Sequence, residues 1–292
     1  MSVTPGGIVQ ALARAARRCA ATDDALVEGI RHSPAAAADE TGWAVRRDQV
    51  SAVPTSSATG SPSAGSSTPR GWDQAEQILG EDFAGVIERD GWAAYRRFAE
   101  ATHRTCCAHL LRRCHDMTAD AADGHTRVPA TARQIPKDAL ALRDARDAGR
   151  VDPQTPAAQV PQLGDRLDLL LAADATCCEP CSQTRQAPAC RARRAAHFLV
   201  VPGVQATNWR AEQGIRPIVV NRRHWGGDRT RQGADTLQVL ASVLRSARQQ
   251  HRDPVGILAP LLTSPVPIVA DLAIPGRPDV PGHDDPAQPR AA

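Results

Sequence analysis

Aromatic residues and lysine are scarce in this chain of 292 residues. Phe, Trp and Tyr together make up 3%, which is thin for a large core, and Lys137 is the one lysine among 35 Lys and Arg residues. No stretch approaches the roughly 20 apolar residues that a membrane span needs. The N-terminal sequence has no basic leader followed by a long apolar run, so we expect no signal peptide and a cytoplasmic protein without a membrane anchor.

Apolar residues make up 42% of the chain, an ordinary globular share, and its length is sufficient for one large or two modest domains. The net charge of +3 is mildly basic and does not by itself require a nucleic-acid partner. Many arginines occur in pairs, at 17–18, 46–47, 96–97, 112–113, 193–194 and 222–223. Such pairs are found on solvated helix faces as well as at phosphate contacts, so both interpretations stay open.

Eight cysteines are present, at positions 19, 106, 107, 114, 177, 178, 181 and 190. Without a secretory signal, reduced thiols are expected. A zinc site is one alternative, because CCEPC at 177–181 contains a C-x-x-C and Cys190 follows. A strong zinc signal needs two well-spaced ligand pairs, and the second pair here is irregular. We therefore expect Cys106 and Cys114 to be core thiols and His109 to face the fold rather than a metal.

A segment poor in large apolar residues interrupts the N-terminal half. Residues 46–70 hold seven Ser, three Thr, three Pro and two Gly, with no Leu, Ile or aromatic residue. Such a segment cannot bury enough surface to offset the entropy of ordering it. We predict a flexible, disordered linker here, and a disordered tail over the Pro-, Gly- and Asp-rich residues 271–292.

Hydrophobic spacing predicts helices and strands elsewhere. An N-terminal helical segment, 1–34, contains a helix over 7–31, and a C-terminal helical segment, 235–270, begins with a strongly amphipathic helix over 235–250. Further helical patterns cover 72–83, 91–117, 131–174 and 208–217. The last of these is expected to end at Pro217, before PIVVNRRHW, which has strand character. Short apolar runs at 35–39 and 83–90 are compatible with buried strands, and each ends in an acid.

Three acids stand out by their positions. Asp39 and Asp90 each close an apolar, strand-like run, and Glu212 lies inside a helical pattern. Acids at the ends of two neighbouring strands can converge with one from a helix packed on the sheet, but converged carboxylates repel one another. A divalent cation removes that cost, and hard oxygen ligands select Mg²⁺ or Mn²⁺. Two such ions about 4 Å apart would suit in-line phosphoryl transfer. N-caps and surface ion pairs are the alternative.

Four motifs carry a resemblance to a known family: DETGW (39–43), GEDFAGVIERDGWAAYRRF (80–98), HRTCCAHLLRRC (103–114) and PGVQATNWRAEQGIRPIVVNRRHWGGDRT (202–230). They closely resemble the transposases of the insertion-sequence-66 family. The helix over 235–254 and the LLTSPVP that follows resemble that family's C-terminal segment. The similarity runs from about residue 5 to about residue 270, with two gaps, and the last motif is long and specific.

The resemblance implies an α/β fold similar to RNase H-like DDE enzymes, with a mixed sheet flanked by helices. The catalytic domain would cover 35–234 and include a helical insertion over 115–200. The family's first, second and third catalytic acids would fall on Asp39, Asp90 and Glu212, which would bind Mg²⁺ or Mn²⁺.

The implied chemistry is hydrolysis of a DNA phosphodiester at the element end, followed by attack of the freed 3′-hydroxyl on target DNA. Arg210, Arg216, Arg222 and Arg223 would contact phosphates of element-end and target DNA, positioning rather than specifying the sequence. Local salt bridges are an equal alternative for these arginines. The resemblance leaves open a homo-oligomer and accessory proteins of the element.

Two departures from the family pattern affect the expected activity. The family places a sheet hairpin after its first acid, which the composition of residues 46–70 does not support, and 175–195 is similarly irregular. Both segments suggest translation in a shifted frame. The family's N-terminal DNA-binding and zinc-binding extension is also not expected here. Without the hairpin Asp39 would be misplaced, and about 1 Å of misplacement can cost about 100-fold in rate, so weak or no activity is expected.

Two further interpretations remain. Basic helices over 96–113 and 235–252 could make the chain a non-catalytic DNA-binding remnant or regulatory fragment, whose binding would depend on salt but not on Mg²⁺. The chain could also be a pseudogene product that never folds stably.

Overall fold

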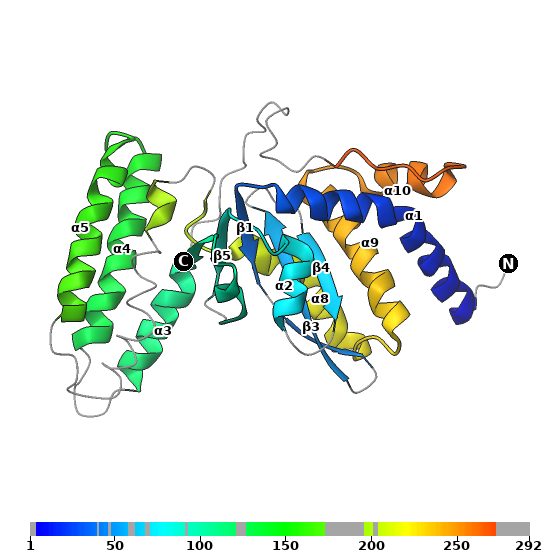
Figure 1. The fold of residues 1–292 in the computed structure, drawn as a ribbon, viewed down its shortest axis with the longest axis horizontal. Coiled ribbons are helices and arrows are strands. Elements are labelled where there is room, and N and C mark those ends of the chain that lie inside the picture. The colour runs from blue at the N-terminus through cyan, green and yellow to red at the C-terminus, as the bar shows by residue number, and fades with distance from the viewer. Residues whose placement is uncertain are drawn as a thin grey trace.

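The computed structural model describes residues 4–39, 41–45, 48–57, 62–67, 71–90, 93–120, 127–172, 196–200 and 204–272. These residues form a mixed α/β structure that is mostly helical (Figure 1). Its helices are α1 (Pro5–Arg31), α2 (Gly71–Leu79), α3 (Cys107–Ala119), α4 (Arg127–Asp147), α5 (Thr155–Ala172), α8 (Trp209–Trp225), α9 (Arg231–Gln249) and α10 (Pro254–Thr263), with the 3₁₀ helices η1 (Ala93–Arg97) and η4 (His197–Leu199). None of the described helices is long and apolar enough to cross a membrane.

The described strands form one sheet. They are β1 (Ala35–Ala38), β2 (Thr41–Val45), β3 (Asp48–Ser57), β4 (Pro62–Ser67), β5 (Val86–Arg89) and β6 (Thr102–Thr105). β1 pairs in parallel with β5, and β5 in parallel with β6, whereas β3 pairs antiparallel with β1, β2 and β4. β1 and β2 follow one another against β3 in one continuous register, with Ala38 opposite Thr55 and Thr41 opposite Ala52.

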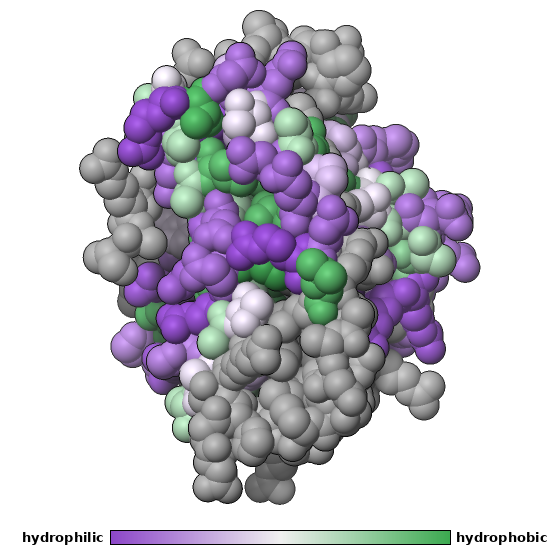
Figure 2. All heavy atoms as spheres, turned by 90° about the vertical axis from the view of Figure 1, so that its left-hand side faces the viewer, coloured by the Kyte–Doolittle hydropathy of each residue, from purple (hydrophilic) through white to green (hydrophobic). Residues whose placement is uncertain are grey.

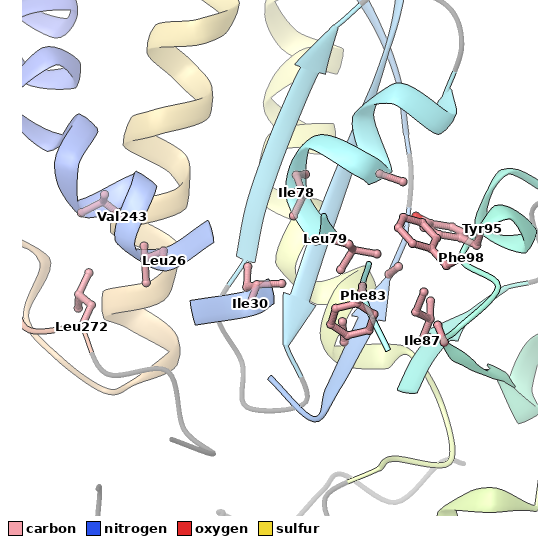
Figure 3. Close-up of a cluster of buried hydrophobic side chains, with 14 of the residues drawn as sticks. Leu26, Ile30, Ile78, Leu79, Phe83, Ile87, Tyr95, Phe98, Val243 and Leu272 are labelled. Carbon is pink, nitrogen blue, oxygen red and sulfur yellow. The ribbon is translucent and has the colours of Figure 1, made fainter. Parts of the chain in front are cut away.

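The two faces of the sheet belong to two apolar clusters, because side chains alternate between faces along a strand. Ala36, Ala38 and Ile87 belong to the first cluster, and Ala35 and Val86 to the second. The first cluster draws on α1, α2, α9 and α10, and includes Leu26, Ile30, Ile78, Leu79, Phe83, Tyr95, Phe98 and Val243 (Figure 3). The second draws on α3, α4, α5, η4 and the segment before α8, and includes Leu110, Ile135, Leu163, Phe198 and Ala206.

The helices α3, α4 and α5 stand together on one side of the sheet, and α1, α9 and α10 stand on the other (Figure 1). Basic and acidic side chains lie together on α4 and α5 and form ion pairs, such as Nη1 of Arg166 with Oδ2 of Asp138 at 2.6 Å. Seen from that side, the coloured surface is mainly hydrophilic, with apolar residues scattered among charged and polar ones (Figure 2).

The segment expected to be a disordered linker contains two strands. Within 46–70 the structure describes residues 48–57 and 62–67, and these are β3 and β4. The expectation that this segment could not supply a hairpin is therefore wrong for the residues described. Composition indicates only how much apolar surface a segment can bury by itself. β3 is stabilised by backbone hydrogen bonds to β1, β2 and β4, and helices α2, α8 and α9 contact this part of the sheet.

Two helical predictions also need correction. Residues 91–117 were expected to form helical turns, but they also contain β6, whose Thr102 pairs with Val86 and Thr105 with Arg89. The helix expected to end at Pro217 continues as α8 to Trp225, so the strand expected for PIVVNRRHW is not formed. Proline removes the N–H that would bond to the carbonyl four residues earlier. That carbonyl belongs to Gln213, and Arg245 of α9 donates to it at 3.0 Å, which compensates the lost bond.

This compensation can be tested with a double-mutant cycle. Arg245→Met should lower the free energy of unfolding by about 1 to 2 kcal/mol, because it leaves the Gln213 carbonyl without a donor. In a Pro217→Ala background the helix supplies its own donor, so the same substitution should cost less. Urea denaturation of the four proteins measures both costs. Equal costs in the two backgrounds would show that the guanidinium does not act through this carbonyl.

An acid is buried where α1 packs along α9. Asp23 is 6% exposed, and its burial raises the pKa of its carboxyl to about 6, an effect that a hydrogen bond with Ser242 opposes and nearby Asp24 reinforces. The native carboxyl therefore holds its proton up to about pH 6, whereas the unfolded one loses it near pH 4. The free energy of unfolding should consequently fall as pH rises from about 4 to about 6.

Asp23→Asn should remove this pH dependence. At pH 7 to 8 the substitution should raise the free energy of unfolding by about 2 kcal/mol, because a neutral amide replaces a buried charge, and the gain should vanish near pH 4. Thermal melts between pH 4 and pH 8 measure the effect. Asp24→Asn, at the exposed neighbouring position, is the control and should change stability by less than about 0.5 kcal/mol. A gain for Asp23→Asn that is the same at every pH would contradict the assignment.

Candidate active site

Two aspartates follow the ends of neighbouring parallel strands. Ala37 of β1 lies opposite Glu88 of β5, and Asp39 and Asp90 each lie two residues further along, directly after the strand ends. Adjacent strands lie about 5 Å apart, so a register continued by two residues would bring the two carboxylates within reach of a shared ligand. Strand alternation would then direct both to the face of Ala35 and Val86, which belong to the second apolar cluster. Both aspartates are half-buried.

The third predicted acid lies in the first turn of α8, a helix that contacts β1 and β3. An acid in a first turn interacts favourably with the helix dipole. The Glu212 side chain is 41% exposed, and its Oε1 lies 3.7 Å from Nδ1 of His109 on α3. The structure therefore brings Glu212 next to His109, which was expected to face the fold rather than a metal.

A pair of buried residues, Cys106 and Asn208, joins the backbone at all three acids, and we call it the junction pair. The Cys106 amide donates to the carbonyl of Arg89, the residue before Asp90, at 3.0 Å. The backbone amide of Asn208 donates to Sγ of Cys106 at 3.4 Å. The side-chain Nδ2 of Asn208 donates to the carbonyl of Ala38, the residue before Asp39, at 3.5 Å. The Asn208 carbonyl accepts from the Glu212 amide at 3.1 Å.

A buried ion pair lies two residues before Asp90 on the same face of β5. Glu88 and Arg104 face each other across the parallel β5–β6 register, with Oε1 and Nη1 2.7 Å apart and side chains 6% and 0% exposed. Burial raises the pKa of the Glu88 carboxyl to about 7, while Arg104 and, more weakly, Arg210 oppose the shift. The Phe198 ring covers the Arg104 guanidinium, with 5.4 Å between the ring centroid and Cζ of Arg104. In the sequence, the one indication of this ion pair is the acidic Glu88 two residues before Asp90.

The cysteines near the site are structural thiols. Cys106, Cys107 and Cys114 are buried, as is Cys19, which confirms the expectation of core thiols for Cys106 and Cys114. Burial raises the pKa of the Cys106 and Cys114 thiols to about 11 and that of Cys107 to about 12, so they stay protonated at neutral pH. Protonated thiols are poor metal ligands. The C-x-x-C at 177–181 and Cys190 lie outside the described residues, as does the irregular segment 175–195.

The arginines predicted to bind phosphate lie on α8. Arg210 is half-buried and close enough to Glu88 to affect the pKa of that carboxyl, whereas Arg216 and Arg223 are exposed. Arg216 is four residues after Glu212, and Arg223 is eleven after it, so all three lie on one face of the helix. The side chain of Arg222 lies outside the described part of the structure. A basic row thus extends along α8 away from the third acid.

A metal centre requires several ligands within a few ångströms. Over the described ranges, no group of three or more His, Cys, Asp or Glu side chains is close enough together to hold a metal ion. Oxygen donors from Asp39, Asp90 and Glu212 suit Mg²⁺ or Mn²⁺ in kind. The two aspartates follow the ends of neighbouring strands, and Glu212 lies beside His109. In this conformation the three residues are of the right chemical type for such an ion, but their carboxylates do not surround a single point.

Comparison with known proteins identifies the family. A family model described as "Transposase IS66 family" matches residues 1–236 of the 292. The chain therefore belongs to this family of transposases, as its four motifs predicted. No curated protein and no solved structure matches the chain.

Proposed function

We propose that this transposase cleaves and joins DNA with Asp39, Asp90 and Glu212 as its acidic triad, on a sheet of the RNase H-like type. The observation that carries the proposal is the parallel pairing of β1 and β5, because Asp39 and Asp90 follow directly after the ends of these two strands. The mixed strand order, with β3 antiparallel on one side of β1 and β5 parallel on the other, supports the fold assignment.

The three carboxylates would hold Mg²⁺ or Mn²⁺. Such ions, when bound, would stabilise the attacking and leaving oxygens of an in-line phosphoryl transfer. Asp39 and Asp90, carried by paired strands, form the fixed side of the site, and Glu212 forms the side that His109 contacts. The nearby Arg104 compensates the negative charge of Glu88, so this carboxylate does not add uncompensated charge next to Asp90.

DNA is the proposed substrate, and the α8 face is its proposed contact. Arg216 and Arg223 are exposed on the same helix face as Glu212, so a phosphate backbone lying along α8 would reach the acidic site with its charge neutralised. Such contacts position the duplex and carry no sequence information.

The activity should depend on the strand-end aspartates. We expect purified protein to nick and join labelled element-end DNA in Mn²⁺, and Asp90→Asn to lower the rate by about three orders of magnitude or more, because a neutral amide replaces a charged ligand. The control is Asp116→Asn, at an exposed position of α3, which should leave the rate unchanged. The pairing of β3 with β1 removes the ground for expecting a misplaced Asp39.

The outcomes separate the candidate functions. Salt-dependent DNA binding without any Mn²⁺-dependent cleavage would instead favour the non-catalytic DNA-binding fragment. Cleavage by Asp90→Asn at the rate of the unaltered protein would rule out the proposed triad. The absence of a cooperative melt would indicate a chain that does not fold stably.

The arginine row should contribute to binding through its charge. Replacing Arg216 and Arg223 together by Ala should weaken DNA binding and reduce the slope of log affinity against log salt by about 2, because two phosphate contacts are lost. The matched control replaces Arg143 and Arg146 of α4, which pair with the adjacent Asp144 and Asp147. Fluorescence anisotropy across a salt series measures the slope. An equal change in both double variants would show that only net charge matters.

A further inference from the structure

We infer that Asn208 is a positioning residue that sets the three acids relative to one another, with Cys106 as its partner. The inference rests on the proposed function and deepens it, because it assigns a role to a residue that touches the backbone next to the acids rather than the reacting groups. The chain has two asparagines, Asn208 and Asn221. Asn208, directly before α8, is 0% exposed, whereas Asn221 within α8 is exposed.

The three hydrogen bonds of Asn208 lead to three different elements. Its side-chain Nδ2 reaches the end of β1 at Ala38, and its backbone amide reaches Cys106 at the start of α3. Its carbonyl accepts from Glu212, four residues on in α8. The amide of Cys106 continues the connection to Arg89 at the end of β5. Each acid is therefore one residue, or one helical turn, from a bond that involves the junction pair.

These connections matter because the third acid comes from a separate element. β1 and β5 are aligned by their own ladder, but α8 could slide or rotate on the sheet without breaking a strand–strand bond. The bond from Nδ2 to Ala38 resists that motion at the first turn, where Glu212 lies. The backbone amide of Cys107 also donates to the carbonyl of Ala206, just before α8, at 3.0 Å. This bond resists the same motion of α8.

The chemistry of the side chain also indicates more than packing. Among the described residues, Oδ1 of Asn208 is buried and has no hydrogen-bond partner. A buried polar atom left unpaired lowers stability, so packing alone does not explain a side-chain amide at this position. The amide therefore serves the donor bond to Ala38, and it leaves an acceptor beside the ends of the acidic strands.

Two substitutions test the role. Asn208→Asp keeps the shape but replaces the donor by an acceptor that faces the Ala38 carbonyl, and Asn208→Ala removes the group. The control is Asn221→Ala on the exposed side of α8. Mn²⁺ binding to the intact protein is titrated by electron paramagnetic resonance of the free ion, and DNA affinity is measured separately in EDTA. Cleavage in Mn²⁺ is the third measurement, and thermal melts check folding.

We expect both Asn208 variants to melt cooperatively, to need at least tenfold more Mn²⁺ for half-saturation and for half-maximal cleavage, and to bind DNA in EDTA within twofold of the unaltered protein. Asn221→Ala should match the unaltered protein in all assays. A second arm uses Cys106: Cys106→Ser keeps an acceptor for the Asn208 amide and should retain Mn²⁺ binding, whereas Cys106→Val should lose it.

The failures are distinguishable. If Asp90→Asn loses Mn²⁺ binding but the Asn208 variants keep it, the positioning role is wrong and the proposed function stands. If Asp90→Asn binds Mn²⁺ as the unaltered protein does, or the unaltered protein binds none, the proposed function fails and the positioning role fails with it. If both Asn208 variants lose their cooperative melt, Asn208 is a structural residue and the positioning role is overturned.

Discussion

The parallel pairing of β1 with β5 is the constraint on which the site depends. Hydrogen bonds between the two strands align their carboxyl ends, and Asp39 and Asp90 follow directly after these ends. Both faces of these strands are buried, one under each apolar cluster, which keeps the ladder dry and fixed. β3, on the other side of β1, completes this support. Glu212 depends on a different kind of connection, the junction pair, because its helix is not part of the ladder.

Part of this arrangement could be predicted from sequence for physical reasons. The runs AAAAD and VIERD were predicted as strands ending in acids, because short apolar runs that stop at a charge are typical of buried strands. β3 and β4 were missed because their partners, and not their composition, stabilise them. The continuation of α8 through Pro217 depends on Arg245, 28 residues further on, which no local pattern reveals. The Glu88–Arg104 pair likewise requires the register of β5 against β6.

The family and the geometry support each other at different levels. Membership in the transposase family rests on residues 1–236, which include all three acids. The structure adds that two of them follow directly after paired parallel strands and that hydrogen bonds connect the segment of the third to the same strand ends. It also shows exposed arginines on α8, the helix that carries Glu212, and these are the proposed contacts for DNA.

The most direct measurement is anomalous diffraction from crystals of the protein bound to element-end DNA and soaked in Mn²⁺. The account predicts an anomalous peak between the carboxylates of Asp39 and Asp90, with a Glu212 oxygen among the ligands. A Mn²⁺ peak at another place in the protein, with none between these two aspartates, would contradict the central claim that the ends of β1 and β5 form the metal-binding side of the site.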